Sequence, residues 1–299
     1  MTDSGKNNSI KASEKLQDVI TRGIGKIGKK ENDKGRQEDI IITEVPAGDT
    51  KENELRARIS ERIIFRESKR QMNVENINKV ATGQFSPDDT VTSDHVNDDW
   101  LSRFYNIVED ISDTAMQGLW GRILAAEVVQ PGTFSLRTLE ILKNMSQREA
   151  SVFIRFAALA LQAGATSFVI NPDNSEFLTR EYNISFNDRM ILEEAGLINS
   201  NDLFYTLRGH GKTPFEFGKL ILLVERGNNC PEQSVPVLAF TKAGAELRKL
   251  IKQPLDIKYF NRFARLFADN DVRVSYANII SRNGPDIIYS NPAVNLPSE

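Results

Sequence analysis

The sequence predicts a mainly helical α+β fold with a long N-terminal helix, a compact helical module and a winged-helix-like C-terminal half. Three observations predict this class. Apolar residues recur at helical spacing through most of the first 160 residues. A Ser-x-x-Glu capping box at 146–149 begins a second group of helices. Short β-rich segments separated by turn residues follow between 203 and 240.

Residues 1–50 are predicted to be a flexible basic tail with one amphipathic segment and a linker. Leu16, Val19 and Ile20 form part of a helical stripe, but three glycines from Gly23 to Gly28 weaken the helix. We therefore expect this helix to form only against a partner, a membrane surface or the body of the protein. Its candidate surface-docking cations are Arg22, Lys26, Lys29 and Lys30.

Residues 51–145 are predicted to hold a long charged helix followed by the helical module. Ion pairs at i,i+4, such as Glu52–Arg56, support the long helix. Leu55, Ile59 and Ile63 give it a narrow apolar seam that fades after residue 65. A sustained coiled coil is therefore not predicted. The seam indicates a helix that packs on a partner or on its own dimer mate.

The helical module is predicted from apolar stripes that contain both tryptophans. Trp100 begins the first stripe, Trp120 lies in the second, and Pro131-Gly132 ends the second helix. Ser135 is the predicted N-cap of the third helix. Large aromatic side chains on regular stripes are mostly core residues, and an interface role is the alternative.

Residues 146–252 are predicted to be winged-helix-like, and 253–299 to be a C-terminal helix, strand and tail. A helix ends at Gly196 in a left-handed turn before Leu197 and Ile198. We expect a hairpin from 203–207 and 220–224, and then a strand that enters a Thr241-x-x-Gly helix.

Catalytic and metal-binding patterns are not found, so no catalytic residue, metal ligand or cofactor is predicted. The two histidines, His95 and His210, lie apart, and the single cysteine, Cys230, has no base beside it in the sequence. The glycine-rich segment 23–30 resembles a phosphate-binding loop. It lacks the preceding buried strand and the following packed helix that such a loop requires.

Nucleic-acid binding is the alternative that a winged helix suggests. Across 146–252 there are twelve Lys/Arg and twelve Asp/Glu residues, so the segment is neutral. Neutrality favours protein contact over phosphate contact. The candidate nucleic-acid contacts are Arg208, Lys212, Arg226 and Lys242.

Three short runs carry a family resemblance: Asp99-Trp-Leu-Ser-Arg-Phe104, Leu119-Trp-Gly-Arg-Ile-Leu-Ala125 and Pro131-Gly-Thr-Phe-Ser-Leu-Arg-Thr-Leu139. The chain resembles a bacterial family known only as a domain of unknown function. It is also similar, more distantly, to abortive-infection alpha proteins. That likeness implies a role in anti-phage defence.

Within these runs Trp100, Trp120, Arg103, Arg122 and Arg137 are the candidate interaction residues. Arg122 is expected to pair with Glu109 or Asp110. The sequence thus predicts a cytoplasmic, non-enzymatic interaction or scaffold protein without a transmembrane segment. Its expected setting is anti-phage defence or a mobile element, where it would be an accessory protein. A protein partner or self-association is expected. The alternatives are a DNA-binding winged-helix regulator and an effector that contacts membranes through residues 10–30.

Overall fold

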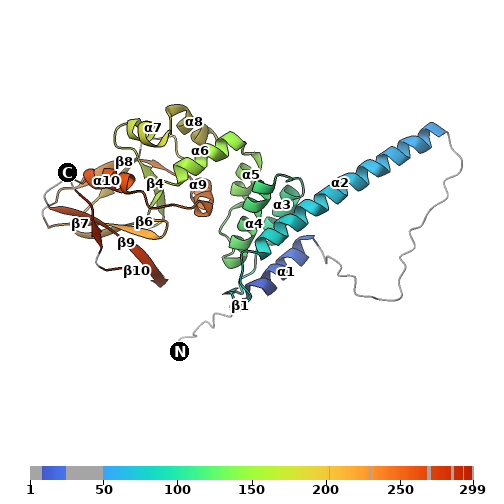
Figure 1. Cartoon of the computed structure of the whole chain (residues 1–299), viewed down its shortest axis with the longest axis horizontal. Coiled ribbons are helices and arrows are strands. Elements are labelled where there is room, and N and C mark those ends of the chain that lie inside the picture. The colour runs from blue at the N-terminus through green and yellow to red at the C-terminus, as the bar shows by residue number, and fades with distance from the viewer. Residues whose placement is uncertain are drawn as a thin grey trace. The chain divides into compact units, whose positions relative to one another are not determined.

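The computed structural model describes residues 9–24, 50–201, 203–228, 230–267, 271–283, 286–291 and 293–297 (Figure 1). The fold is mixed α+β. The chain divides into two compact units, Met1–Leu139 and Glu140–Glu299. This division falls before the boundary that the sequence suggested at 145/146. The described part of the predicted tail, residues 9–24, lies within the first unit, and the described residues of 253–299 lie within the second.

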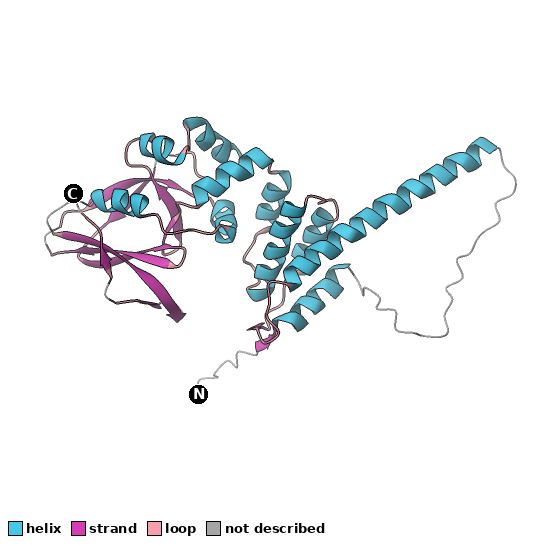
Figure 2. Cartoon of the chain, in the orientation of Figure 1, coloured by secondary structure: helices cyan, strands magenta, loops and turns pink. Residues whose placement is uncertain are grey.

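The first unit begins with a short strand and a helix, and other elements of the same unit cover this helix. Strand β1 (Ser9–Lys11) pairs antiparallel with β2 (Thr90–Thr92). Helix α1 (Ala12–Ile24) follows and lies against α3 (Asp98–Val108) and α4 (Thr114–Val129) (Figure 2). Its apolar stripe, with Leu16, Val19 and Ile20, is buried. The sequence allowed a partner, a membrane surface or the body of the protein as the surface that supports this helix. The structure shows that the helix packs on the body of the protein.

Helix α2 (Thr50–Thr82) packs its C-terminal part directly on α4. The contact is close because Gly121 has no side chain: a Cβ there would lie 2.5 Å from Val80 Cγ1. Hydrogen bonds of polar side chains stabilise the same contact between α2 and α4. Gln117 Nε2 donates to Asn73 Oδ1 at 3.1 Å, and Asn73 Nδ2 donates to the Glu109 carbonyl oxygen at 2.8 Å. The packing and these bonds together fix how α2 is rotated about its axis.

The tryptophans belong to the core of the first unit. The rings of Trp100 and Phe104 stack at 5.1 Å between centroids, and Trp120 packs edge-on to Phe104. Trp100 Nε1 donates to the Phe134 carbonyl oxygen at 2.8 Å. The buried Glu127 carboxylate accepts hydrogen bonds from backbone N–H groups in the 131–134 turn, which orients that turn beneath the core.

The second unit is built around one antiparallel sheet. Helix α5 (Leu136–Asn144) spans the division between the units, and α6 (Gln147–Ala157) begins with the predicted capping box of Ser146 and Glu149. The strands follow the order β10-β9-β7-β6-β3-β4-β8-β5, with β11 paired to β9. Their bounds are β3 (Leu161–Ala163), β4 (Thr166–Ile170), β5 (Leu203–Leu207), β6 (Gly211–Phe217), β7 (Leu220–Arg226), β8 (Gln233–Ala239), β9 (Val272–Asn283), β10 (Asp286–Tyr289) and β11 (Val294–Asn295).

The hairpin predicted from 203–207 and 220–224 does not form. Strand β5 pairs with β8, whereas β7 lies between β6 and β9. The reason is local: a tight turn at Gly218, with φ of +59°, joins β7 to β6. Strand β6 contains Pro214 and several polar residues, so its sequence did not read as a strand.

Helix α10 (Ile257–Arg265) packs an aromatic face on the sheet. Phe260 and Phe263 contact Phe217 and Phe215 of β6. The Tyr259 hydroxyl is buried and accepts a hydrogen bond from the Ile170 N–H at 3.0 Å. The remaining helices of the described chain are α7 (Glu176–Tyr182), α8 (Phe186–Glu194), α9 (Lys242–Leu247) and the short 3₁₀ turn Arg248–Leu250.

The close contact between α2 and α4 predicts opposite outcomes for two glycines of one helix. Gly121→Ala should lower the free energy of unfolding by about 2 to 3 kcal/mol, because the added methyl group meets Val80 and the Ile77 carbonyl oxygen. Gly118→Ala should be neutral or raise it by up to about 1 kcal/mol, since nothing lies within 4 Å of its Cβ position. Denaturant melts of both variants test this; equal effects would contradict the close contact.

Candidate functional site

Helix α2 changes from buried to exposed along its length. In its C-terminal part Val74, Ile77 and Ala81 are at most 6% exposed, because they face α4. In its N-terminal part Leu55, Ile59 and Ile63 are 49%, 38% and 45% exposed. Exposed branched apolar side chains at regular spacing on one helix are uncommon on a free protein surface.

The buried apolar residues of α2 share one side of the helix with Leu55, Ile59 and Ile63. Three further exposed apolar residues lie off this side: Ile64, Phe65 and Met72. Leu55, Ile59 and Ile63 are four residues apart, and Ile63, Arg70 and Ile77 are seven apart, so all remain on one face of the helix. Figure 1 shows α2 continuing past α1, α3 and α4. No described element of the first unit covers the face formed by Leu55, Ile59 and Ile63, which we call the α2 seam.

Arg70 marks the point where the covered part of α2 ends. Its Nε lies 3.0 Å from Asp110 Oδ1, and its Nη2 lies 3.4 Å from Glu109 Oε1. The hydrogen bond to Asp110 raises the pKa of Arg70 further above its usual range. This arrangement corrects the expected pairing of Arg122, which is exposed on α4 while Arg70 occupies both carboxylates.

A row of cations follows one flank of the α2 seam. Lys51, Arg58, Arg62 and Lys69 are spaced by seven, four and seven residues, which places them on one side of the helix, and all are exposed. On the same stretch two other arginines pair within the helix: Arg56 with Glu52 at 2.7 Å and Arg66 with Glu67 at 2.9 Å. From 51 to 70 there are seven Lys/Arg and four Asp/Glu residues, a net charge of +3.

The structure separates the interaction residues that the sequence singled out. Trp100 and Trp120 are buried, whereas Arg103, Arg122 and Arg137 are exposed on α3, α4 and α5. Each tryptophan therefore lies on the core side of the helix whose outer side carries an exposed arginine. The five residues are not brought together at one surface.

The candidate nucleic-acid contacts are also dispersed. Arg226 is buried and donates to the carbonyl oxygens of Gly209, Cys230 and Pro231. Arg208 pairs with Glu232 at 3.0 Å and Lys212 with Glu225 at 3.8 Å. Lys242 follows the opposite end of β8, about 20 Å along that strand. These residues do not form one basic patch.

The predicted docking cations of the N-terminal segment divide in a similar way. Arg22 Nη2 lies 2.6 Å from Asp98 Oδ1 and donates to the Val96 carbonyl oxygen at 2.7 Å. The hydrogen bond from Arg22 lowers the pKa of Asp98. Arg22 thus holds α1 against the body of the first unit. Lys26, Lys29 and Lys30 lie outside the described residues.

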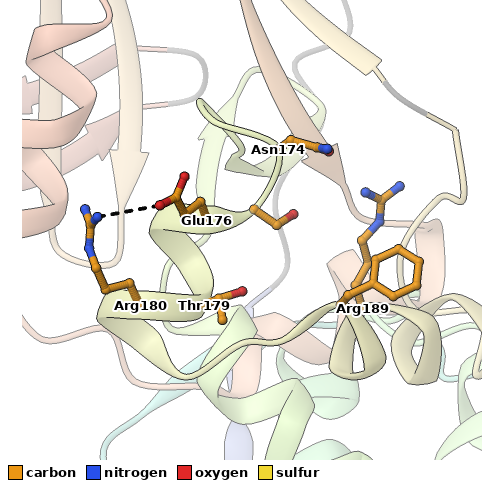
Figure 3. Close-up of a pocket in the computed structure, with 7 residues that line it drawn as sticks. Asn174, Glu176, Thr179, Arg180 and Arg189 are labelled. Atoms are coloured by element: carbon orange, nitrogen blue, oxygen red, sulfur yellow. Dashed lines mark ion pairs between the residues drawn. The ribbon is translucent and has the colours of Figure 1, made fainter.

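A shallow pocket of about 390 Å³ in the second unit lies beside α7 and α8 (Figure 3). Its charged groups have partners in the chain: Arg180 Nη1 is 4.0 Å from Glu176 Oε1, and Arg189 Nε is 2.7 Å from Glu193 Oε1. The lining residues are Asn174, Ser175, Glu176, Thr179, Arg180, Phe186 and Arg189. They include neither histidine nor cysteine, and no nucleophile–base pair is found among them.

Two further searches of the described residues gave no site. No group of three or more histidine, cysteine, aspartate or glutamate side chains is placed to hold a metal ion. Among the helices described, none combines the length and the apolar character needed to cross a bilayer.

Fold and surface together define a two-unit α+β protein whose most distinctive feature is an exposed, basic helix face. The chain belongs to the family described as a protein of unknown function, DUF2806, whose model matches residues 57–264. The match covers most of α2 and continues into α10. A search of curated proteins gave no match, and neither did a search of solved structures.

The sequence contains two signals for this site. The spacing of residues 55, 59 and 63 predicts the α2 seam. The cations at 51, 58, 62 and 69 have a helical periodicity of their own, which the sequence interpretation above does not include. Arg70 could not be assigned from sequence, because its carboxylate partners are about 40 residues away and meet it only in the folded unit.

The change from buried to exposed predicts unequal effects of the same substitution along one face. Ile77→Asp should lower the free energy of unfolding by at least about 4 kcal/mol, because it buries a charge against α4. Ile59→Asp should change it by no more than about 0.5 kcal/mol. Chemical denaturation of the purified chain measures both. A large loss for Ile59→Asp would show that another part of the chain covers the α2 seam.

Proposed function

We propose that this chain is a protein-interaction protein that docks a partner helix along the α2 seam. The observation that carries the proposal is the continuation of the α4-facing side of α2 as an apolar but uncovered face. A helix packs on another helix through anchors at i, i+4 and i+8, which is the spacing of Leu55, Ile59 and Ile63.

The rotation of α2 supports this assignment. Its C-terminal part is fixed by the Gly121 contact and by the hydrogen bond between Gln117 and Asn73. The seam therefore has a defined direction and is preorganised for docking, which lowers the entropic cost of association. The α2 seam extends over about 12 Å of helix, enough for two turns of a partner.

The setting of the interaction follows from the resemblance to abortive-infection alpha proteins. On that analogy we place the protein in bacterial anti-phage defence, as a component that recruits another protein. The proposal includes no catalytic step. Genes beside this one that encode a nuclease, a protease or another toxic effector would support that setting, and neighbours restricted to housekeeping functions would contradict it.

Photo-crosslinking in cells of the source organism tests the docking itself. A photoreactive phenylalanine analogue at position 59 faces the proposed partner, whereas the same analogue at 61 points to the opposite side of an equally exposed helix. We expect a discrete protein adduct from position 59 and not from 61. The absence of an adduct at 59, or the same adducts from both positions, would overturn the proposal.

A further inference from the structure

We infer that the partner of the α2 seam is an amphipathic helix of another protein, with a row of carboxylates along the edge that meets Arg58, Arg62 and Lys69. This inference rests on the docking function proposed above and adds the chemistry of the partner. Its basis is the combination of an apolar seam with an unbalanced row of cations on one flank.

The apolar seam by itself is too small to hold a partner. Leu55, Ile59 and Ile63 are each about half exposed, so a partner that covers them fully removes only about half of each side chain's surface from water. Association also costs free energy in lost translational and rotational freedom, and three partly exposed side chains do not offset that cost. The remaining free energy must come from other contacts beside the seam, and on one flank these groups include the cations Arg58, Arg62 and Lys69 together with the exposed Phe65.

Lys51, the first residue of the cation row, interacts within the described chain, but the arginines in the middle of the row do not. Arg58 and Arg62 are exposed and have no ion-pair partner among the described residues, unlike Arg56 and Arg66 on the same helix. Arg56 and Arg62 lie three residues before and three after Ile59, which places them on opposite flanks of the α2 seam. The unpaired charge is therefore confined to one flank, and it complements an acidic edge.

The chain itself shows how this face is covered elsewhere. One heptad beyond Ile63, Arg70 binds the two carboxylates Glu109 and Asp110 that follow α3, while Ile77 packs on α4. An apolar contact bordered by arginine–carboxylate pairs is thus the mode in which α2 already meets helices of its own unit. The inferred partner makes the same kind of contact about two turns closer to the N-terminus of α2. It thereby extends the interface that α3 and α4 already form with this helix.

A second copy of α2 does not fit the α2 seam as well. Two copies would bring a net charge of +3 against +3 over residues 51–70, and like charges along a shared seam oppose pairing. The acidic residues of this stretch do not relieve the repulsion fully, because Glu52 and Glu67 already pair within their own helix. We therefore assign the site to a different, acidic chain.

A displayed peptide library tests the inference with the full-length protein as bait. The library has a fixed leucine seam on a helical peptide, and its flanking positions vary among glutamate, glutamine and lysine. We expect selection on the wild-type chain to enrich glutamate on one edge of the peptide. The enriched peptides should bind about ten-fold more weakly to Arg62→Glu than to wild type, and more weakly in high salt.

Arg56→Glu is the matched control, because it makes the same charge change on the other flank of the same exposed helix. Its effect on peptide binding should be less than about two-fold. Enrichment of lysine or glutamine, equal effects of the two reversals, or a dimer of the purified chain that Ile59→Asp dissociates would each overturn the inference.

The result also separates the partner's chemistry from the docking function. Peptides that lose binding on Ile59→Asp but not on Arg62→Glu would leave the docking function intact and remove only the acidic partner. Peptides indifferent to both substitutions would show that the α2 seam is not a binding surface, and both conclusions would fall.

Discussion

The approach of α2 to Gly121 of α4 is the contact on which the arrangement of the first unit depends. With no Cβ at 121, the Val80 side chain and the Ile77 backbone reach the α4 backbone directly. Gln117 and Asn73 then fix the helix in rotation through a buried hydrogen bond, and Tyr105 donates to Asn78 one turn further along. A turn of α2 by one residue would rotate it by about 100° and point the seam elsewhere. The surface at Ile59 is therefore set by packing at Val80.

The exposed half of α2 persists as a helix because the buried half nucleates it. An isolated helix of about 20 residues is marginal in water, since its first turn is costly to form. Here that cost is met by the part packed on α4, and each further residue adds a backbone hydrogen bond. The i,i+4 ion pair Glu52–Arg56 adds a few tenths of a kcal/mol. The residues of α2 that precede Arg70 make no core contact. Their side chains are therefore not constrained by packing and can serve the proposed recognition.

The sequence predicts the features that depend on neighbouring residues. It does not predict the contacts between residues far apart in the chain. The capping box at Ser146, the turn at Gly196 and the α2 seam all depend on residues within one or two turns of each other. The sheet order was inaccessible because β6 pairs with β7 through a turn, while β5 reaches β8 across about 25 residues. From the sequence alone, Arg70 and Arg122 are equally good candidates to pair with Glu109. Only the tertiary fold shows that Arg70 forms the pair. The role of Gly121 in the Trp120-Gly-Arg122 motif also becomes visible only in the fold, where α2 packs against it.

The exposed part of α2 carries a local excess of cations, and the recognition that we propose depends on it. In the second unit several cations lie against carboxylates of the same unit, as in Arg208–Glu232 and Arg262–Asp173, and these pairs produce little field beyond the surface. On α2 the cations outnumber the acids and stand in one row. A row of unbalanced charge attracts an oppositely charged chain from about a Debye length, roughly 8 Å at physiological salt. The neighbouring seam then discriminates among acidic chains, because only a helix with apolar residues in matching register can cover Leu55, Ile59 and Ile63. In the proposed function, the cations that attract the partner and the apolar residues that select it thus lie on adjacent faces of one helix.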